Sequence, residues 1–220
     1  MILNLKYIGL QEKCLHVLDI LKRKYKDHFI LIEGFYIWLN YFFYKKMKNE
    51  YISRTTLIKK YDNMIPKQLK GKKIYRNMLK QMDDIITNYS GDINIRCISN
   101  PINININNNN LIGYINLITK NKNKYKIHQF IYKDIPHYDN TFAEKITPGF
   151  LAASFLSDFH LDNFELTIHS LNSKHKIKTI YFDKPKIELF RDKSFELITN
   201  IEQNCSSCEF KRECKYEKRN

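Results

Sequence analysis

Three cysteines near the end of the sequence carry the strongest chemical signal in this chain. Cys205, Cys208 and Cys214 have the spacing C-x2-C-x5-C, so three of the five cysteines lie within ten residues. A C-x-x-C turn presents two thiolates to one metal, and a third cysteine a short way along can complete one face of the site. Lys211 and Arg212 favour the thiolate form and offset the negative charge of a thiolate-bound cluster. The pattern predicts a metal centre, either an iron–sulfur cluster or a zinc ion.

A fourth ligand is needed for either metal, and two cysteines are available. Cys14 lies on the apolar stripe of a predicted helix, and Cys97 lies on the apolar face of a predicted strand. For each of them taken alone, a buried structural thiol is the commoner role, because free cysteine is among the most buried residue types. The residues by themselves therefore leave the choice between Cys14 and Cys97 open.

The charge of the chain favours a polyanionic partner. Lysine and arginine together number 37 against 23 aspartates and glutamates, which gives a net charge of +14 in 220 residues. Such an excess is typical of proteins that bind nucleic acid, and we expect DNA. The chain is also crowded with asparagine, isoleucine and lysine, as AT-rich codon usage would produce, so part of the lysine excess has an alternative origin.

The distribution of apolar residues predicts no transmembrane helix. No run of about 20 apolar residues is present, and the most apolar stretch, 29–44, is interrupted by Glu33 and Asn40. The first six residues lack the pattern of a signal peptide. We therefore expect a cytoplasmic protein with no membrane partner, whose cysteines are metal ligands or free thiols before they are disulfides.

The elements that must position the cysteines change in type at Gly91. Residues 1–90 show apolar positions at helical spacing, which predicts a helical N-terminal part packed on a core. After Gly91, apolar and polar residues alternate, which predicts strands. We expect strands at about 93–97, 102–106, 111–119, 125–133, 164–171 and 176–182, a helix from Phe150 after Pro148 and Gly149, and a last helix at about 193–201. This order predicts an α/β protein with a mixed central sheet flanked by helices, whose core spans 91–220 and ends in the cysteine cluster.

With this order of elements, the terminal C-x2-C-x5-C motif resembles the iron–sulfur branch of the PD-(D/E)XK nucleases. That branch includes the AddB-type nuclease domains and the RecB-like exonucleases of CRISPR adaptation. In those proteins the fourth cysteine lies upstream of the core, on a helical segment. The resemblance implies a 4Fe-4S cluster held by Cys14, Cys205, Cys208 and Cys214, which would join the two ends of the chain.

The resemblance also implies where catalytic residues would lie. The family strand Gly-x-x-Asp corresponds to Gly113-Tyr114-Ile115-Asn116, in which asparagine replaces the metal-binding aspartate. The family motif Asp/Glu-x-Lys corresponds to Ile131-Tyr132-Lys133, in which only the lysine remains. The helix that carries a glutamine and a tyrosine in the family has Leu151 and Phe155 at the best matching positions. Asn116 and Lys133 are thus the remnants of a degenerate nuclease site.

Loss of both carboxylates removes the ligands that Mg²⁺ and Mn²⁺ prefer. Our leading hypothesis is a DNA-binding iron–sulfur protein of RecB-like nuclease fold that no longer cuts and that acts with other DNA-processing proteins in one complex. The second hypothesis is an active Mg²⁺- or Mn²⁺-dependent DNA exonuclease with relocated ligands, Asp92 or Asp134 with Lys133. The third is a zinc-stapled interaction module that binds no nucleic acid.

Overall fold

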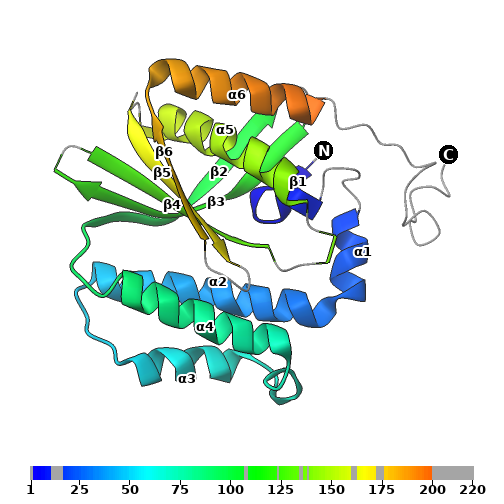
Figure 1. Ribbon diagram of the computed structural model, residues 1–220, viewed down its shortest axis with the longest axis vertical. Coiled ribbons are helices and arrows are strands. Elements are labelled where there is room, and N and C mark those ends of the chain that lie inside the picture. The colour runs from blue at the N-terminus through cyan, green and yellow to red at the C-terminus, as the bar shows by residue number, and fades with distance from the viewer. Residues whose placement is uncertain are drawn as a thin grey trace.

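The central sheet lies between two layers of helices (Figure 1). This computed structural model describes residues 2–10, 17–106, 109–122, 124–133, 136–137, 139–159, 163–171 and 176–199. Cys14, Cys205, Cys208, Cys214 and Asp134 fall outside these residues, so the predictions made for them remain predictions.

The sheet has six strands and mixed directions in the described part of the chain. Strand β3 pairs antiparallel with β2 and β4, β4 pairs parallel with β5, and β5 pairs antiparallel with β6. The short β1 pairs parallel with the first half of β3. The strands are β1 (Ile2–Asn4), β2 (Ile95–Ile106), β3 (Asn109–Asn121), β4 (Lys124–Tyr132), β5 (Phe164–Leu171) and β6 (Lys176–Phe182).

The helices divide between the two faces of the sheet. Helices α2 and α4 cover one face with α3 outside them, and α5 and α6 cover the other (Figure 1). The helices are η1 (Leu5–Leu10), α1 (Val17–Lys24), α2 (Lys26–Met47), α3 (Arg54–Met64), η2 (Lys67–Leu69), α4 (Lys73–Asn88), α5 (Asn140–Phe159) and α6 (Lys184–Thr199). The predicted class is confirmed: a mixed sheet is flanked by helices, and the N-terminal part is helical.

The aromatic face of α2 joins the helical part to the sheet. Trp38 stacks on Phe42 with ring centroids 5.6 Å apart, and its indole N–H donates to the Leu57 carbonyl at 3.1 Å. Phe43 contacts Phe130 of β4, with 5.7 Å between ring centroids. Each of these buried rings removes a large apolar area from water. The buried residues of both parts accordingly belong to one hydrophobic cluster.

Strand β2 joins the two stretches that were predicted as strands at 93–97 and 102–106 into one element. Pro101 lies inside β2, opposite Tyr114 of β3. Proline has no backbone N–H to donate to a second neighbouring strand. An edge strand has no second neighbour, so it does not need that donor. Among the described strands, β2 pairs with β3 alone, so the proline is tolerated.

Both C-terminal helices begin earlier than predicted. Helix α5 starts at Asn140 and contains Pro148, whose interior position costs about 3 kcal/mol. Burial of Ile146, Phe150 and Leu151 offsets that cost. Helix α6 starts at Lys184 because the Asp183 carboxylate accepts from the Lys186 N–H at 3.1 Å, which satisfies one donor of the first turn.

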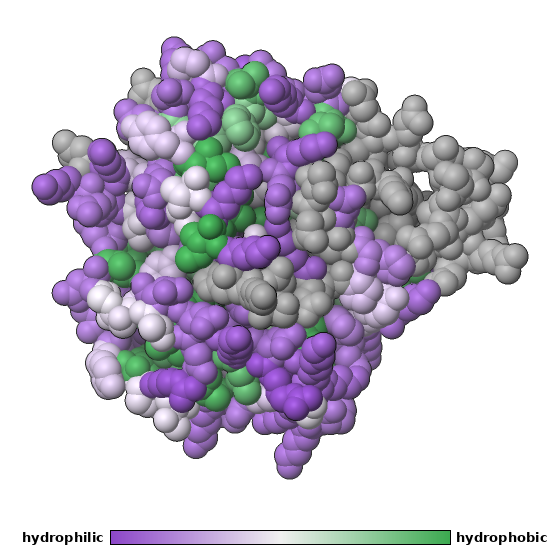
Figure 2. Space-filling view, viewed as in Figure 1, coloured by the Kyte–Doolittle hydropathy of each residue, from purple (hydrophilic) through white to green (hydrophobic). Residues whose placement is uncertain are grey.

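Polar residues cover most of the surface seen in Figure 2, and its apolar residues are scattered. Among the described helices, none combines the length and the apolar composition needed to cross a bilayer.

Helices α5 and α6 approach closely at Gly149, which gives a test of the packing. A Cβ there would overlap Ser194 Oγ and the Phe190 carbonyl oxygen, so Gly149→Ala should destabilise the fold by about 1–3 kcal/mol. Urea unfolding measures the change. Gly71→Ala is the matched control, because a Cβ at Gly71 would meet nothing within 4 Å. Equal stability of the two variants would contradict the close packing.

Candidate functional site

Strands β3 and β4 pair along only part of their length. Their backbone ladder runs from Asn121–Lys124 to Leu117–His128. Beyond that pair the strands separate, and β1 instead pairs with β3 from Asn110 to Ile112. Backbone groups at the point of separation need other partners, because a buried unpaired N–H or C=O is costly.

Two side-chain amides supply those partners. The Asn116 Oδ1 accepts from the Phe130 N–H at 2.8 Å. The Gln129 Oε1 accepts from the Asn116 N–H at 3.3 Å, and its Nε2 donates to the Tyr114 carbonyl at 3.3 Å. Both side chains are buried, at 7% and 3% exposure. An amide suits Gln129 because the position uses both an acceptor and a donor, which a carboxylate does not offer.

The separation opens a recess of about 580 Å³, which we call the strand-separation pocket. Asn116 and Gln129 line it from the sheet, and Glu33 and Tyr36 line it from α2. The remaining lining residues come from the N-terminal segment, α1, α2, β2 and β3: Asn4, Lys6, Tyr7, Lys22, Ile37, Asn40, Ser99, Pro101, Ile102, Asn103, Ile112, Gly113 and Tyr114. Of the predicted site residues that the structure describes, Asn116 lines this pocket and Lys133 does not.

The charges in the pocket are Lys6, Lys22 and Glu33, and two of them are paired. Lys6 Nζ lies 2.6 Å from a Glu33 carboxylate oxygen and 4.1 Å from the centroid of the Tyr36 ring, and Tyr7 donates to the same carboxylate. Burial lowers the pKa of Lys6, which Glu33 opposes. Burial pushes the pKa of Glu33 upward, but the charge and hydrogen bond of Lys6, the hydrogen bond of Tyr7 and the charge of Lys22 together outweigh it, so that pKa is lowered. The carboxylate is therefore ionised and neutralised by lysine.

Gly113 has a packing role in the wall of this pocket. A Cβ at Gly113 would lie 2.7 Å from the Leu5 Cβ. The absence of a side chain lets η1 lie directly against β3, which holds Lys6 and Tyr7 over the pocket. This contact explains the glycine without a catalytic role.

Lys133 lies elsewhere, in a different recess of about 410 Å³. Its Nζ donates to the Glu144 carboxylate of α5 at 2.7 Å, and its backbone N–H donates to the Leu171 carbonyl. The hydrogen bond from Lys133 lowers the pKa of Glu144, and the charges of Lys178 and Lys176 act in the same direction. Asn116 and Lys133 therefore line separate pockets. Leu151 is buried in the core, and the Phe155 side chain is outside the described residues.

In the part of the chain that the structure describes, no cluster of potential metal ligands lies near Asn116. Among the described residues, no three His, Cys, Asp or Glu side chains form a group that could hold a metal ion. Asp92, a candidate for a relocated ligand, lines a third recess with Glu165 at the other end of β3. Cys97 is half-buried, its sulfur contacts Asn100 Oδ1 at 3.6 Å, and burial raises its thiol pKa.

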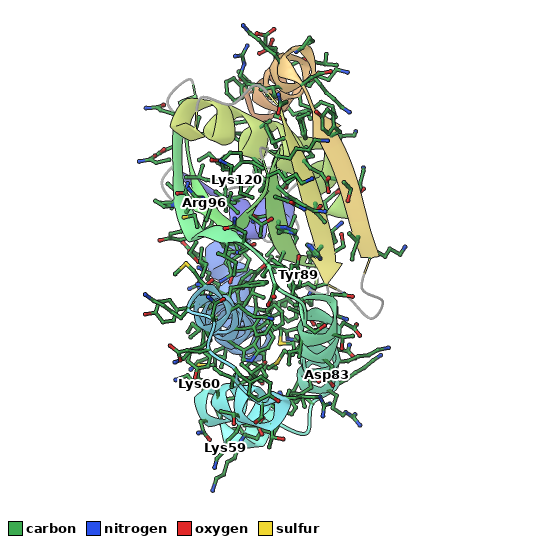
Figure 3. All side chains as sticks on the ribbon, turned by 90° about the vertical axis from the view of Figure 1, so that its left-hand side faces the viewer. Lys59, Lys60, Asp83, Tyr89, Arg96 and Lys120 are labelled. Carbon is green, nitrogen blue, oxygen red and sulfur yellow. The ribbon has the colours of Figure 1, made fainter. Side chains whose placement is uncertain are left out.

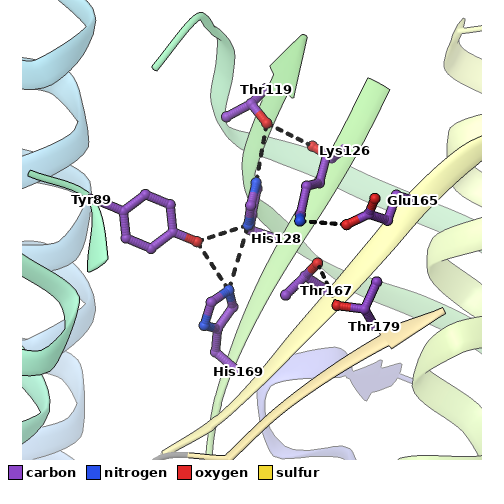
Figure 4. A network of polar contacts seen from close by, with 8 residues as sticks. All are labelled: Tyr89, Thr119, Lys126, His128, Glu165, Thr167, His169 and Thr179. Atoms are coloured by element: carbon purple, nitrogen blue, oxygen red, sulfur yellow. Dashed lines mark hydrogen bonds and ion pairs between the residues drawn. The ribbon is translucent and has the colours of Figure 1, made fainter. Parts of the chain in front are cut away.

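A buried polar network crosses the sheet between α4 and β5 (Figure 4). The Tyr89 hydroxyl lies 2.8 Å from His128 Nδ1 and 3.0 Å from His169 Nε2. Thr119 Oγ1 lies 3.1 Å from His128 Nε2 and 3.5 Å from the Lys126 carbonyl oxygen. One arrangement of protons satisfies these contacts: His169 donates to Tyr89, Tyr89 to His128, His128 to Thr119, and Thr119 to the carbonyl.

That arrangement needs an uncharged His128. Burial first, and the charge of Lys126 second, lower the pKa of His128 to about 3. Burial also raises the pKa of Tyr89, so its hydroxyl keeps its proton. Tyr89 and His128 are therefore uncharged at physiological pH, and the network joins the end of α4 to the sheet through hydrogen bonds.

Gln129, Lys6 and Glu33 are not among the site residues predicted from the sequence. The signal for Gln129 was present, because glutamine is the amide counterpart of the glutamate in the Asp/Glu-x-Lys motif. Recognising it required the register of β4 against β3. The sequence carries no comparable signal for Lys6 or Glu33.

No family model matches this chain, and no curated protein matches it. Among solved structures, the chain is similar to one titled "Crystal structure of SSO0001", with 13% sequence identity and a TM-score of 0.32. The similarity covers 74% of this chain and 80% of that chain. A similarity this weak carries no functional inference, so function has to be inferred from the site itself.

Because His128 is neutral in the folded protein, we expect the stability of the fold to begin to fall at an unusually high pH. In the unfolded chain His128 gains a proton near its ordinary pKa of 6.5, whereas the folded protein keeps it neutral down to about 3. The unfolded state therefore binds more protons below pH 6.5. Stability should fall by up to about 1.4 kcal/mol per pH unit between about 6.5 and 3.

Urea unfolding of wild type and His128→Gln at several pH values above 4.5 isolates this contribution, because the ordinary pKa of Glu33 and Glu144 is 4.5. The variant should be less stable at neutral pH but show a flatter dependence on pH. Parallel stability curves for the two proteins would rule out a neutral His128 in the folded state.

Proposed function

We propose that this chain is a DNA-binding protein of RecB-like nuclease fold that does not cut DNA and that acts as a subunit of a DNA-processing complex. The observation that carries the proposal is the amide pair, Asn116 and Gln129, at the point where β3 and β4 separate. Both amides are committed to backbone hydrogen bonds, and the ionised Glu33 nearby is paired with Lys6.

The order of elements supports the RecB-like part of the proposal. The Gly113–Asn116 motif lies on β3, its neighbour in the sheet is β4, and α5 follows β4. This is the order of the motifs in the family that the sequence resembles. Because Asn116 and Gln129 bond to each other's strand, we infer that Gln129-Phe130-Ile131 replaces the Asp/Glu-x-Lys motif and that Lys133 is a neighbour of it.

On this assignment every catalytic group has been replaced by a neutral one. Asparagine, glutamine and isoleucine would stand in place of aspartate, glutamate and lysine. Neutral amides are much weaker ligands than carboxylates for Mg²⁺ or Mn²⁺, and isoleucine offers no charge to a phosphate. The net charge of +14 supports retained binding to a polyanion.

The proposal includes the 4Fe-4S cluster held by Cys14, Cys205, Cys208 and Cys214, with zinc as the alternative, and a cytoplasmic location. A cluster that joins Cys14 to the C-terminal cysteines would close nearly the whole chain into one loop. Its binding free energy would then contribute directly to folding.

Binding and cleavage assays on one labelled DNA test the function. We expect binding that weakens steeply with salt, and no cleavage with Mg²⁺ or Mn²⁺ beyond a chelator-treated control. Absence of binding at low salt would leave the zinc-stapled interaction module as the better hypothesis. Cleavage that a chelator abolishes would favour the exonuclease with relocated ligands. Loss of that cleavage in Lys133→Ala would then assign a catalytic role to Lys133.

Restoring the carboxylates tests the assignment of the degenerate site. Asn116→Asp with Gln129→Glu should bind Mn²⁺ at least about tenfold more tightly than wild type, measured by calorimetry, because two carboxylates then share one site. The control with the same charge change is Asn63→Asp with Gln68→Glu, both exposed outside the pocket. Asn116→Asp alone keeps the acceptor for the Phe130 N–H and serves if the double variant misfolds. Equal Mn²⁺ affinity of the carboxylate-restored and control variants would refute the assignment.

Metal analysis of protein purified without oxygen tests the cysteine cluster. We expect about four iron and four sulfide per chain, and a visible band that bleaches on reduction. Cys208→Ser should lose the iron and become insoluble or protease-sensitive, whereas Cys97→Ser should keep the iron. Normal solubility and an unchanged melting curve for Cys208→Ser would contradict a structural cluster, and zinc in a colourless sample would support the alternative.

A further inference from the structure

A separate recess lies at the other end of β3, beside the turn that joins β3 to β4. It has a volume of about 1140 Å³, and we call it the hairpin cleft. Four lysines line it, Lys120, Lys122, Lys124 and Lys126. Figure 3 looks onto this end of the sheet and shows Lys120 near Arg96, well apart from Lys59 and Lys60 of α3. All four lysines belong to the hairpin formed by β3 and β4, so their side chains lie close to its tip.

The positive charge of the hairpin cleft is only partly neutralised. Lys126 pairs with Glu165 of β5, and the other carboxylate in the lining is Asp92. Among the described residues, Lys120, Lys122 and Lys124 form no ion pair with a carboxylate, and Lys122 and Lys124 are exposed. Three lysines are therefore available to an external anion.

Aromatic side chains lie beside these lysines. Tyr181 of β6 is 55% exposed and pairs in register with Glu165, which in turn pairs with Lys126 of β4. Lysine, glutamate and tyrosine thus form one row across three strands. Tyr125 also lines the cleft, and Lys120 Nζ lies 4.9 Å from the centroid of its ring. The exposed Tyr181 ring offers a flat surface next to the positive charge.

The inner wall of the hairpin cleft adds no negative charge. Tyr89 and His128 form it, and they are hydrogen-bonded to each other and uncharged. Asn94, Asn121 and Asn163 supply uncharged donors and acceptors around it. A phosphate that entered the cleft would therefore meet the lysines without a buried carboxylate to repel it.

We propose that the hairpin cleft is a binding site for single-stranded nucleic acid, in which Lys122 and Lys124 contact phosphates and Tyr181 stacks on a base. This inference rests on the proposed DNA-binding function but assigns the contact to a surface away from the strand-separation pocket. Lysines along a groove with interspersed aromatic rings are how proteins bind single strands without reading sequence. Bases in a duplex are stacked on each other, so an exposed tyrosine at a sheet edge has no base face to meet there.

Binding of a fluorescent oligothymidylate of about 20 nucleotides to the full chain tests the site. Lys122→Ala with Lys124→Ala should weaken binding about tenfold at about 0.1 M salt, and should reduce the slope of log affinity against log salt by about 1.4. The matched control is Lys59→Ala with Lys60→Ala, which removes the same charge from exposed neighbouring lysines and should bind as wild type does. Tyr181→Ala should weaken binding at least about fivefold, and Tyr51→Ala, at a 93% exposed tyrosine, should not.

The outcomes separate this inference from the function on which it rests. If the hairpin and α3 variants lost affinity equally, the hairpin cleft would not be the binding site, but the proposed DNA binding would stand. Tighter binding of a duplex of the same length, or no effect of Tyr181→Ala, would overturn the single-strand assignment. No binding by wild-type protein at low salt would overturn the proposed function and the inference together.

Discussion

The separation of β3 from β4 is the constraint on which much of this structure depends. Two strands that part inside a protein leave backbone groups without partners, and each unpaired buried group costs about 1–3 kcal/mol. Asn116 and Gln129 satisfy some of these groups. The Tyr36 hydroxyl satisfies others, because it donates to the Phe130 carbonyl at 2.8 Å and accepts from the Tyr132 N–H at 3.4 Å. These bonds join helix α2 to the backbone edge of β4 that β3 leaves unpaired.

The same separation integrates the N-terminal segment into the sheet. Residues 2–4 pair with β3 where β4 leaves it, and η1 lies against Gly113. Lys6 and Tyr7 consequently meet Glu33 of α2 at the pocket. The helical N-terminal part and the sheet therefore share one hydrophobic core, and the pocket needs residues from both parts.

Interior electrostatics and surface charge are complementary in this protein. Among the described residues, several buried or half-buried ionisable groups are paired, as Lys6 with Glu33 and Lys133 with Glu144, or neutral, as His128. Both solutions avoid the cost of an isolated buried charge. The uncompensated positive charge lies instead on exposed side chains such as Lys122 and Lys124, where it acts on partners in solution.

The sequence by itself determined the mixed α/β class, the helical N-terminal part and the bounds of β5 and β6, because apolar spacing is a local signal. It also pointed to Asn116 through the motif Gly113–Asn116. Only the tertiary structure decided that Gln129 is the partner of Asn116 and that Lys133 lies in another pocket, since strand register is not written in either strand alone. Strand β1 was equally hidden, because three residues carry no periodic signal and pair with a strand near Asn110 that is distant in sequence.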